Sequence, residues 1–170
     1  MPYLRVWFYD PVGDSQGLVN KLVARLDPPY CHTELQFSNN VSCSVYMGSS
    51  VMLRERSFES HNYTCVSVPC TPQQETLART RAQQCFNDKQ SFSTFHMSTC
   101  FLGSDTFDDP SKTFCSKLVY EILHHAGLVS GTVRGGGVSP SALYRMLNTN
   151  KQIKDTTSVV KSIAIGFKTQ

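Results

Sequence analysis

Residues 112–123, KTFCSKLVYEIL, predict the amphipathic helix that decides the fold of this chain. Apolar side chains recur in and just beyond this stretch at the spacing of one helical face: Phe114, Leu118, Val119, Ile122, Leu123 and Ala126. We expect Thr113 or Ser111 to cap the start of the helix and Gly127 to end it. Cys115 then lies in the first turn, on the side that faces the core.

The predicted position of Cys115 favours a reactive thiol. The first turn of a helix carries unpaired backbone N–H groups and the positive end of the helix dipole. Both stabilise a thiolate and therefore lower the pKa of the thiol. A cysteine on a helix is more often a small buried apolar side chain. The alternative is a nucleophile, which requires a base that is itself held by an orienting partner.

Residues 31–37, CHTELQF, offer both partners on one predicted strand. Because side chains alternate along a strand, His32 and Glu34 point to one face and Thr33 points to the other. One imidazole nitrogen can then meet Glu34, while the other faces a helix packed on that same face. We therefore predict Cys115 as nucleophile, His32 as general base and Glu34 as the group that orients the imidazole.

Each of these residues also has a structural interpretation. His32 alone could be a hydrogen-bonded histidine of the core, and Glu34 could be a solvent-facing strand residue paired with Arg54 or Arg56. His96 is the reserve candidate for the base, because it precedes the cysteine helix closely in the sequence. The joint placement of His32 and Glu34 favours the catalytic interpretation.

The remaining pattern indicates a single α+β domain over residues 1–170, in which an antiparallel sheet is covered by the Cys115 helix. Strands are expected at 3–9, 31–37, 41–47, 50–58 and 63–70, the last four as an antiparallel meander, with further strand character at 158–167. Helices are expected at 18–26, from Pro72 to about Cys85 with Thr71 as N-cap, and after Ser139 and Pro140. Residues 87–113 show neither periodicity and predict a long irregular segment.

Seven cysteines, an odd number at irregular spacing, predict free thiols in a reducing, cytoplasmic setting. A zinc site is the alternative, built from Cys31, Cys43, Cys65 and Cys70 with His32 or His61. The spacing of Cys65 and Cys70 lacks the paired short intervals that such sites usually show. We expect no metal and no cofactor.

Composition and charge exclude several classes of partner. The net charge of +3 comes from 16 basic and 13 acidic residues without a run of like charge, which argues against nucleic acid. The N-terminus lacks the basic start and long apolar run of a signal peptide, and no stretch reaches the roughly 20 apolar residues of a membrane span. RGGGVSP at 134–140 predicts a flap beside the site, and Asp105, Asp108 and Asp109 predict a solvated acidic loop or a cation site.

Three patches carry a resemblance to a known family: HTEL at 32–35, FCSKLVYEILHHAGLV at 114–129 and VSPSALYRML at 138–147. With them the chain resembles the circularly permuted NlpC-type branch of the papain-like cysteine enzymes, particularly the YiiX-like group. The poxviral and lecithin:retinol acyltransferase families are more distant relatives. In that branch the histidine strand, often His-x-Glu, precedes the cysteine helix.

The resemblance implies a permuted papain-like fold with Cys115 as nucleophile, His32 as base and Glu34 as orienting group. Phe92 and Phe95 stand where relatives commonly place a tyrosine, so the backbone N–H of Cys115 is the expected oxyanion donor.

The implied activity is acyl transfer through a thioester, with hydrolysis of an amide in a peptide or protein as the main expectation. A lipid-directed acyltransferase or thiol esterase is the alternative within this chemistry, although no apolar terminal anchor is visible in the sequence. A catalytically silent binding module of the same fold is the alternative outside it.

Overall fold

The computed structural model of the chain describes residues 2–11, 23–58, 61–100, 109, 111–131 and 137–149. Of the helix expected at 18–26, residues 23–26 are described and are helical. The strand expected at 158–167, residues 134–136 of the glycine-rich flap, and Asp105 and Asp108 lie outside the described residues.

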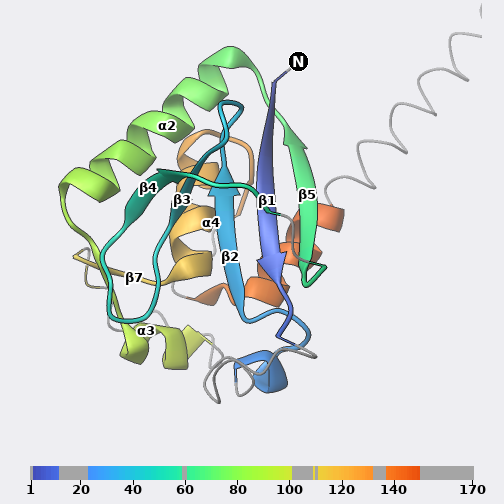
Figure 1. Cartoon of the computed structure of the whole chain (residues 1–170), viewed down its shortest axis with the longest axis vertical. Helices are drawn as coiled ribbons and strands as arrows, with labels where there is room; N and C mark the ends of the chain where they lie inside the picture. The colour runs from blue at the N-terminus through green and yellow to red at the C-terminus, as the bar shows by residue number, and fades with distance from the viewer. Residues whose placement is uncertain are drawn as a thin grey trace, which may run out of the picture.

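A five-stranded antiparallel sheet forms the centre of the fold (Figure 1), in the order β4-β3-β2-β1-β5. Its strands are β1 (Tyr3–Tyr9), β2 (His32–Gln36), β3 (Val41–Ser44), β4 (Met52–Glu55) and β5 (Tyr63–Pro69). The predicted meander of four strands is correct for β2, β3 and β4 and wrong for β5. Instead β5 pairs with β1, because residues 3–9 lie between β2 and β5 and hydrogen-bond to both.

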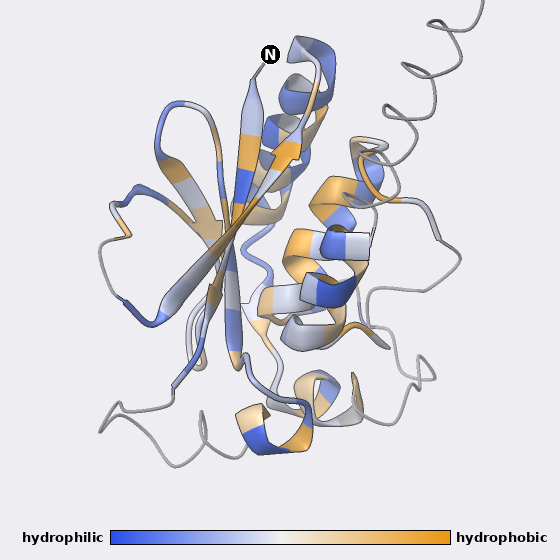
Figure 2. Cartoon of the chain, turned by 90° about the vertical axis from the view of Figure 1, so that its right-hand side faces the viewer, coloured by the Kyte–Doolittle hydropathy of each residue, from blue (hydrophilic) through white to orange (hydrophobic). Residues whose placement is uncertain are grey.

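The alternation along β1 defines the two faces of the sheet. Leu4, Val6 and Phe8 are wholly buried and belong to the main core, whereas Trp7 points to the opposite face. The helices α2 (Pro72–Asn87) and α4 (Cys115–His125) lie on the same side of the sheet in Figure 2. Their buried residues belong to the core cluster that includes Leu4 and Val6, so the core lies between this side of the sheet and the helices.

Both helices begin close to where the sequence predicts. Thr71 caps α2 through a capping box with Gln74, and Pro72 is its first residue, as predicted. Cys115 is the first residue of α4, but the expected side-chain cap is wrong, because the N-cap is Phe114 and makes no side-chain hydrogen bond. Gly127 follows the helix with φ +66°, the left-handed conformation that commonly ends helices.

The segment 87–113 is more regular than predicted. It contains the two-residue strands β6 (Ser91–Phe92) and β7 (Lys112–Thr113), which pair in parallel, and the short helix α3 (Thr94–Thr99). Elements this short cannot reveal a period of 2 or 3.6 residues, so the sequence pattern misses them. The pairing of β7 with β6 leads the chain into the start of α4.

The described residues confirm the α+β class. A final helix over 140–149 begins at the predicted Pro140, and its Leu143 and Leu147 join the core. None of the helices in the described part of the chain has the length and apolar character needed to cross a membrane.

Candidate active site

Cys115 is held where the first turn of α4 meets the start of β2. Its side chain is nearly buried, with 3% of the residue exposed. The backbone N–H groups of Ser116 in the helix and Thr33 in the strand hydrogen-bond to the sulfur and favour its charged form. The sulfur is therefore surrounded by donors from two elements that are distant in the sequence.

His32, the first residue of β2, hydrogen-bonds to the thiol of Cys115. Burial raises the pKa of the thiol, but the hydrogen bond and positive charge of His32 outweigh it, so the pKa lies below the usual value of 9.0. Burial lowers the pKa of His32, but Cys115 and then Glu34 outweigh it and raise that pKa to about 9. Both shifts favour the thiolate–imidazolium form of the pair over its neutral form.

The contact between His32 and Cys115 is made at the end of the strand. Leu35, which points away from His32 and Glu34, lies in the core cluster together with Leu118 of α4. The expectation that α4 packs on the face bearing His32 and Glu34 is therefore wrong for the body of β2. Cys115 still reaches His32, because each is the first residue of its element and the two starts lie together.

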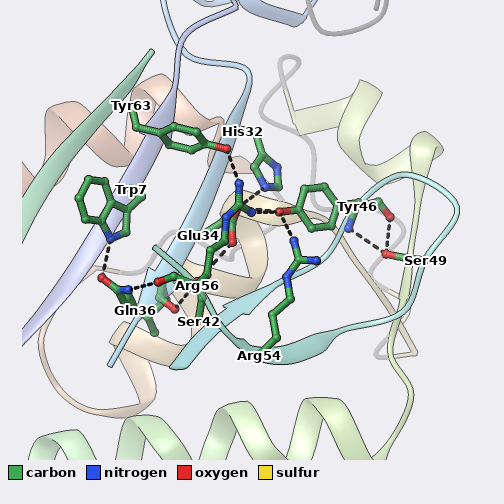
Figure 3. A network of polar contacts seen from close by, with 11 residues as sticks. Trp7, His32, Glu34, Gln36, Ser42, Tyr46, Ser49, Arg54, Arg56 and Tyr63 are labelled. Carbon is green, nitrogen blue, oxygen red and sulfur yellow. Dashed lines mark hydrogen bonds and ion pairs between the residues drawn. The ribbon is translucent and has the colours of Figure 1, made fainter. Parts of the chain in front are cut away.

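Glu34 is wholly buried and is the meeting point of a polar network (Figure 3). Its Oε1 lies 3.5 Å from Nε2 of His32, which is longer than a short charge-assisted hydrogen bond. The Tyr46 hydroxyl donates to the same oxygen at 2.6 Å, and the Ser42 hydroxyl donates to Oε2 at 3.2 Å. Arg56 Nη1 forms an ion pair with Oε1. Because Nε2 faces Glu34, Nδ1 is the imidazole nitrogen left for the thiol.

The electrostatics keep Glu34 ionised. Burial raises the pKa of the carboxyl, but His32, Tyr46 and Arg56 outweigh it and hold the pKa below its usual value. Burial and the hydrogen bond to Glu34 raise the pKa of Tyr46 to about 12, so its hydroxyl stays a donor. The pairing of Glu34 with Arg56, raised as an alternative to the catalytic set, is present together with the contact to His32.

Sequence reasoning missed Ser42, Tyr46 and Tyr63 as members of this site. Tyr46 also covers the imidazole, with ring centroids 4.7 Å apart and an interplanar angle of 23°. Ser42 carries a detectable signal, because strand alternation places it on the same face as its neighbour Gln36. Alternation along the strand expected at 41–47 also places Tyr46 on the face of Ser42, and Arg56 is one of the two partners suggested for Glu34, but no spacing indicates that these residues meet at one carboxylate.

Of the other candidates, Cys31 lies near Cys115, and burial together with the charge of Cys115 raises the pKa of the Cys31 thiol to about 12. His96 lies in α3, where its charge acts on Asp109. Cys43 is buried in the core while Cys65 is exposed, so the residues suggested for zinc are dispersed. Within the described residues, no group of three or more His, Cys, Asp or Glu side chains could hold a metal ion.

Comparisons of the chain with protein-family models, with curated proteins and with solved structures found no match. The chemistry of the site therefore has to be argued from its own atoms. A thiol with a lowered pKa at a helix start, an imidazole in contact with it and a buried carboxylate behind the imidazole are the kinds of group that a nucleophile–base–orienter arrangement requires.

Proposed function

We propose that the protein is a thiol hydrolase that cleaves an amide bond through a thioester intermediate, with Cys115 as nucleophile, His32 as acid and base, and Glu34 as orienting group. The observation that carries this proposal is the mutual shift of Cys115 and His32: a lowered thiol pKa beside a raised imidazole pKa. We also infer that the α+β fold is a permuted papain-like fold, because the histidine strand precedes the cysteine helix.

The reaction follows from the charges of the resting pair. The Cys115 thiolate attacks the carbonyl carbon, and the oxygen of the tetrahedral intermediate takes up the negative charge. The backbone N–H of Cys115, at the start of α4, is the donor proposed for that oxygen. As the C–N bond breaks, the His32 imidazolium gives its proton to the leaving amine, and a thioester and a neutral imidazole remain.

Hydrolysis of the thioester restores the starting state. Neutral His32 accepts a proton from water as the water oxygen attacks the thioester carbon. The carboxylic acid product leaves, Cys115 returns as thiolate, and His32 keeps the proton. Glu34 stays ionised throughout and favours the imidazolium form, because its carboxylate lies 3.5 Å from Nε2.

Site-specific alkylation tests the nucleophile against a strong competitor inside the same chain. Cys65 is exposed whereas Cys115 is nearly buried, so exposure alone makes Cys65 the faster residue. We expect iodoacetamide, followed by peptide mass spectrometry, to label Cys115 faster than Cys65 at neutral pH. We expect His32→Ala to remove this preference, and Cys65→Ser to leave the rate of Cys115 labelling unchanged.

Faster labelling of Cys65 in the wild type, or a preference for Cys115 that is the same in His32→Ala as in the wild type, would contradict the activation of Cys115 by His32. When Cys115 is labelled first, a panel of matched acyl amides and acyl esters distinguishes the amide hydrolase from an ester-directed enzyme. Cys115→Ser is the negative control for both substrates. Turnover of the esters with none of the amides would overturn the amide assignment.

A further inference from the structure

The charged groups of the site do not end at Glu34. Arg56 Nη1 pairs with the same carboxylate oxygen, Oε1, that lies 3.5 Å from Nε2 of His32. The four groups Cys115, His32, Glu34 and Arg56 therefore form one series of neighbours, in which thiolate, imidazolium, carboxylate and guanidinium alternate in sign. The side chains of His32, Glu34 and Arg56 are 14%, 0% and 23% exposed, so water screens this series poorly.

Arg56 is fixed in place by contacts that do not depend on Glu34 alone. Its Nη2 donates to the Tyr63 hydroxyl at 2.9 Å, and its Nη1 donates to the Tyr46 hydroxyl. The guanidinium carbon also lies over the ring of Phe58, 4.7 Å from its centroid. Figure 3 shows the guanidinium between Glu34, Tyr46 and Tyr63. These partners hold the charge against the carboxylate.

Resting on the proposed function, we propose that Arg56 is a positioning residue of the site, which keeps the buried Glu34 carboxylate ionised and directed at His32 by balancing its charge. The charges of the four groups sum to zero when all four groups are ionised. Without Arg56, the thiolate and the carboxylate would outnumber the imidazolium, and a buried site with one net negative charge is costly. Such a site takes up a proton, and the population of thiolate falls.

Several other titratable or charged groups lie around this series. The strands and their adjoining segments contribute Asp10, Cys31, Cys43, Tyr46, Arg54 and Tyr63, and the segment after α3 contributes Cys100. Burial raises the pKa of the three thiols and of both tyrosines, so these five groups are neutral at neutral pH. Asp10 acts on Cys31, and Arg54 contacts the Tyr46 hydroxyl at 3.0 Å.

Arg54 provides a matched control, because within the described residues it is a neighbouring arginine that donates to the Tyr46 hydroxyl and forms no ion pair with Glu34. We would measure the rate of alkylation of Cys115 against pH in the wild type, Arg56→Met, Arg56→Lys and Arg54→Met. For Arg56→Met we expect the midpoint of the profile to rise by about one pH unit or more. Arg54→Met should keep the wild-type midpoint. Arg56→Lys should have a midpoint close to that of the wild type, because it keeps the positive charge.

A second background keeps the test decisive if Arg56→Met does not fold. Glu34→Gln removes the carboxylate that Arg56 balances, and the double variant Glu34→Gln with Arg56→Met contains neither charge. We expect the alkylation midpoint of the double variant to exceed that of Glu34→Gln by less than the rise of about one pH unit expected for Arg56→Met, because no buried carboxylate is left for Arg56 to balance. A rise of about one unit or more between these two variants, or equal midpoints in Arg56→Met and Arg54→Met, would overturn the role of Arg56.

The titration of His32, followed by nuclear magnetic resonance, separates this inference from the proposed function. A wild-type Cys115 that titrates as an ordinary thiol would overturn the hydrolase. Arg56 would still be tested, because its loss should lower the pKa of His32 through Glu34. An unchanged His32 titration in Arg56→Met, beside a reactive Cys115, would overturn the inference and leave the hydrolase standing.

Discussion

The imidazole of His32 stacks on the phenol ring of Tyr46, whose hydroxyl donates to the carboxylate behind that imidazole. Tyr46 thus acts on His32 in two ways, by covering its ring and by holding Glu34. Tyr46→Phe keeps the ring and removes a hydrogen bond to a charged group, which should lower the free energy of unfolding by about 1.5–3 kcal/mol. Tyr46→Ala removes the ring as well.

We expect the rate of Cys115 alkylation to fall more in Tyr46→Ala than in Tyr46→Phe, because only the alanine variant uncovers the imidazole. Urea unfolding of both variants gives the matching change in stability. Equal alkylation rates in the two variants would mean that the stacking does not contribute to the reactivity of the site.

The pH dependence of the site follows from the two shifted pKa values. The thiol pKa is lowered, so the thiolate is present above that value and is lost as the pH falls through it. The pKa of His32 is raised to about 9, so the imidazolium is present below about pH 9 and is lost as the pH rises through it. Amide hydrolysis needs both forms, so we expect a bell-shaped profile of kcat/KM whose upper limb falls near pH 9.

Alkylation, by contrast, needs the thiolate alone and should keep its rate above pH 9. In His32→Ala the charge that lowers the thiol pKa is gone, while burial still raises it. The alkylation midpoint should therefore move upward to at least the ordinary thiol value of about 9. A midpoint shared by the wild type and His32→Ala would contradict the ion pair.

Asp27 joins the final helix to the segment that leads into β2. Its carboxylate accepts hydrogen bonds from Arg145 at 3.0 and 3.2 Å and from the Ser139 hydroxyl. Burial raises the pKa of Asp27, but these partners outweigh it and lower the pKa. This contribution to stability is therefore present above pH 3.8, the usual value, and is lost as the pH falls through the lowered pKa.

Asp27→Asn should lower the free energy of unfolding at neutral pH by about 1–2 kcal/mol, because it weakens bonds to a charged group. The difference from the wild type should shrink as the pH falls below 3.8. Glu55→Gln, at an exposed position of β4, is the control and should change stability by less than about 0.5 kcal/mol. A difference that stays constant with pH would show that the Asp27 charge is unimportant.

Gly127 ends α4 with a backbone that other residues seldom adopt. A methyl group added there would meet no atom within 4 Å, so a substitution would act through the backbone and not through a clash. We expect Gly127→Ala to lower the free energy of unfolding by about 1 kcal/mol and Gly127→Asn to lower it less. Equal urea midpoints for the wild type and Gly127→Ala would contradict the left-handed cap.

The parts of the fold that sequence patterns predict are those set by near neighbours. The alternation of β2, the capping box at Thr71 and the helical spacing after Cys115 each depend on residues within a few positions. The pairing of β1 with β5 has no such signal, because both strands alternate well and either could have paired elsewhere. The prediction that β5 continues the meander is therefore wrong.

The same limit applies to the site. His32 and Glu34 could be joined from the sequence because two residues on one strand share a face. Their link to Cys115 depends on the expectation that the cysteine helix packs on that face, and the structure instead places the two elements in contact at their first residues. Tyr46, Arg56 and Tyr63 converge on Glu34 from separate segments, and their convergence depends on tertiary packing.

The position of β1 between β2 and β5 bears on how the chain folds. The hairpins of β2, β3 and β4 join near neighbours and can form early, whereas β1 reaches its second partner only when β5 closes a long loop around them. Docking of α4 is a further distant contact, since it brings Cys115 to a strand far back in the chain. Refolding should therefore regain secondary structure before thiol reactivity, and the nucleophile would acquire its lowered pKa in the last step.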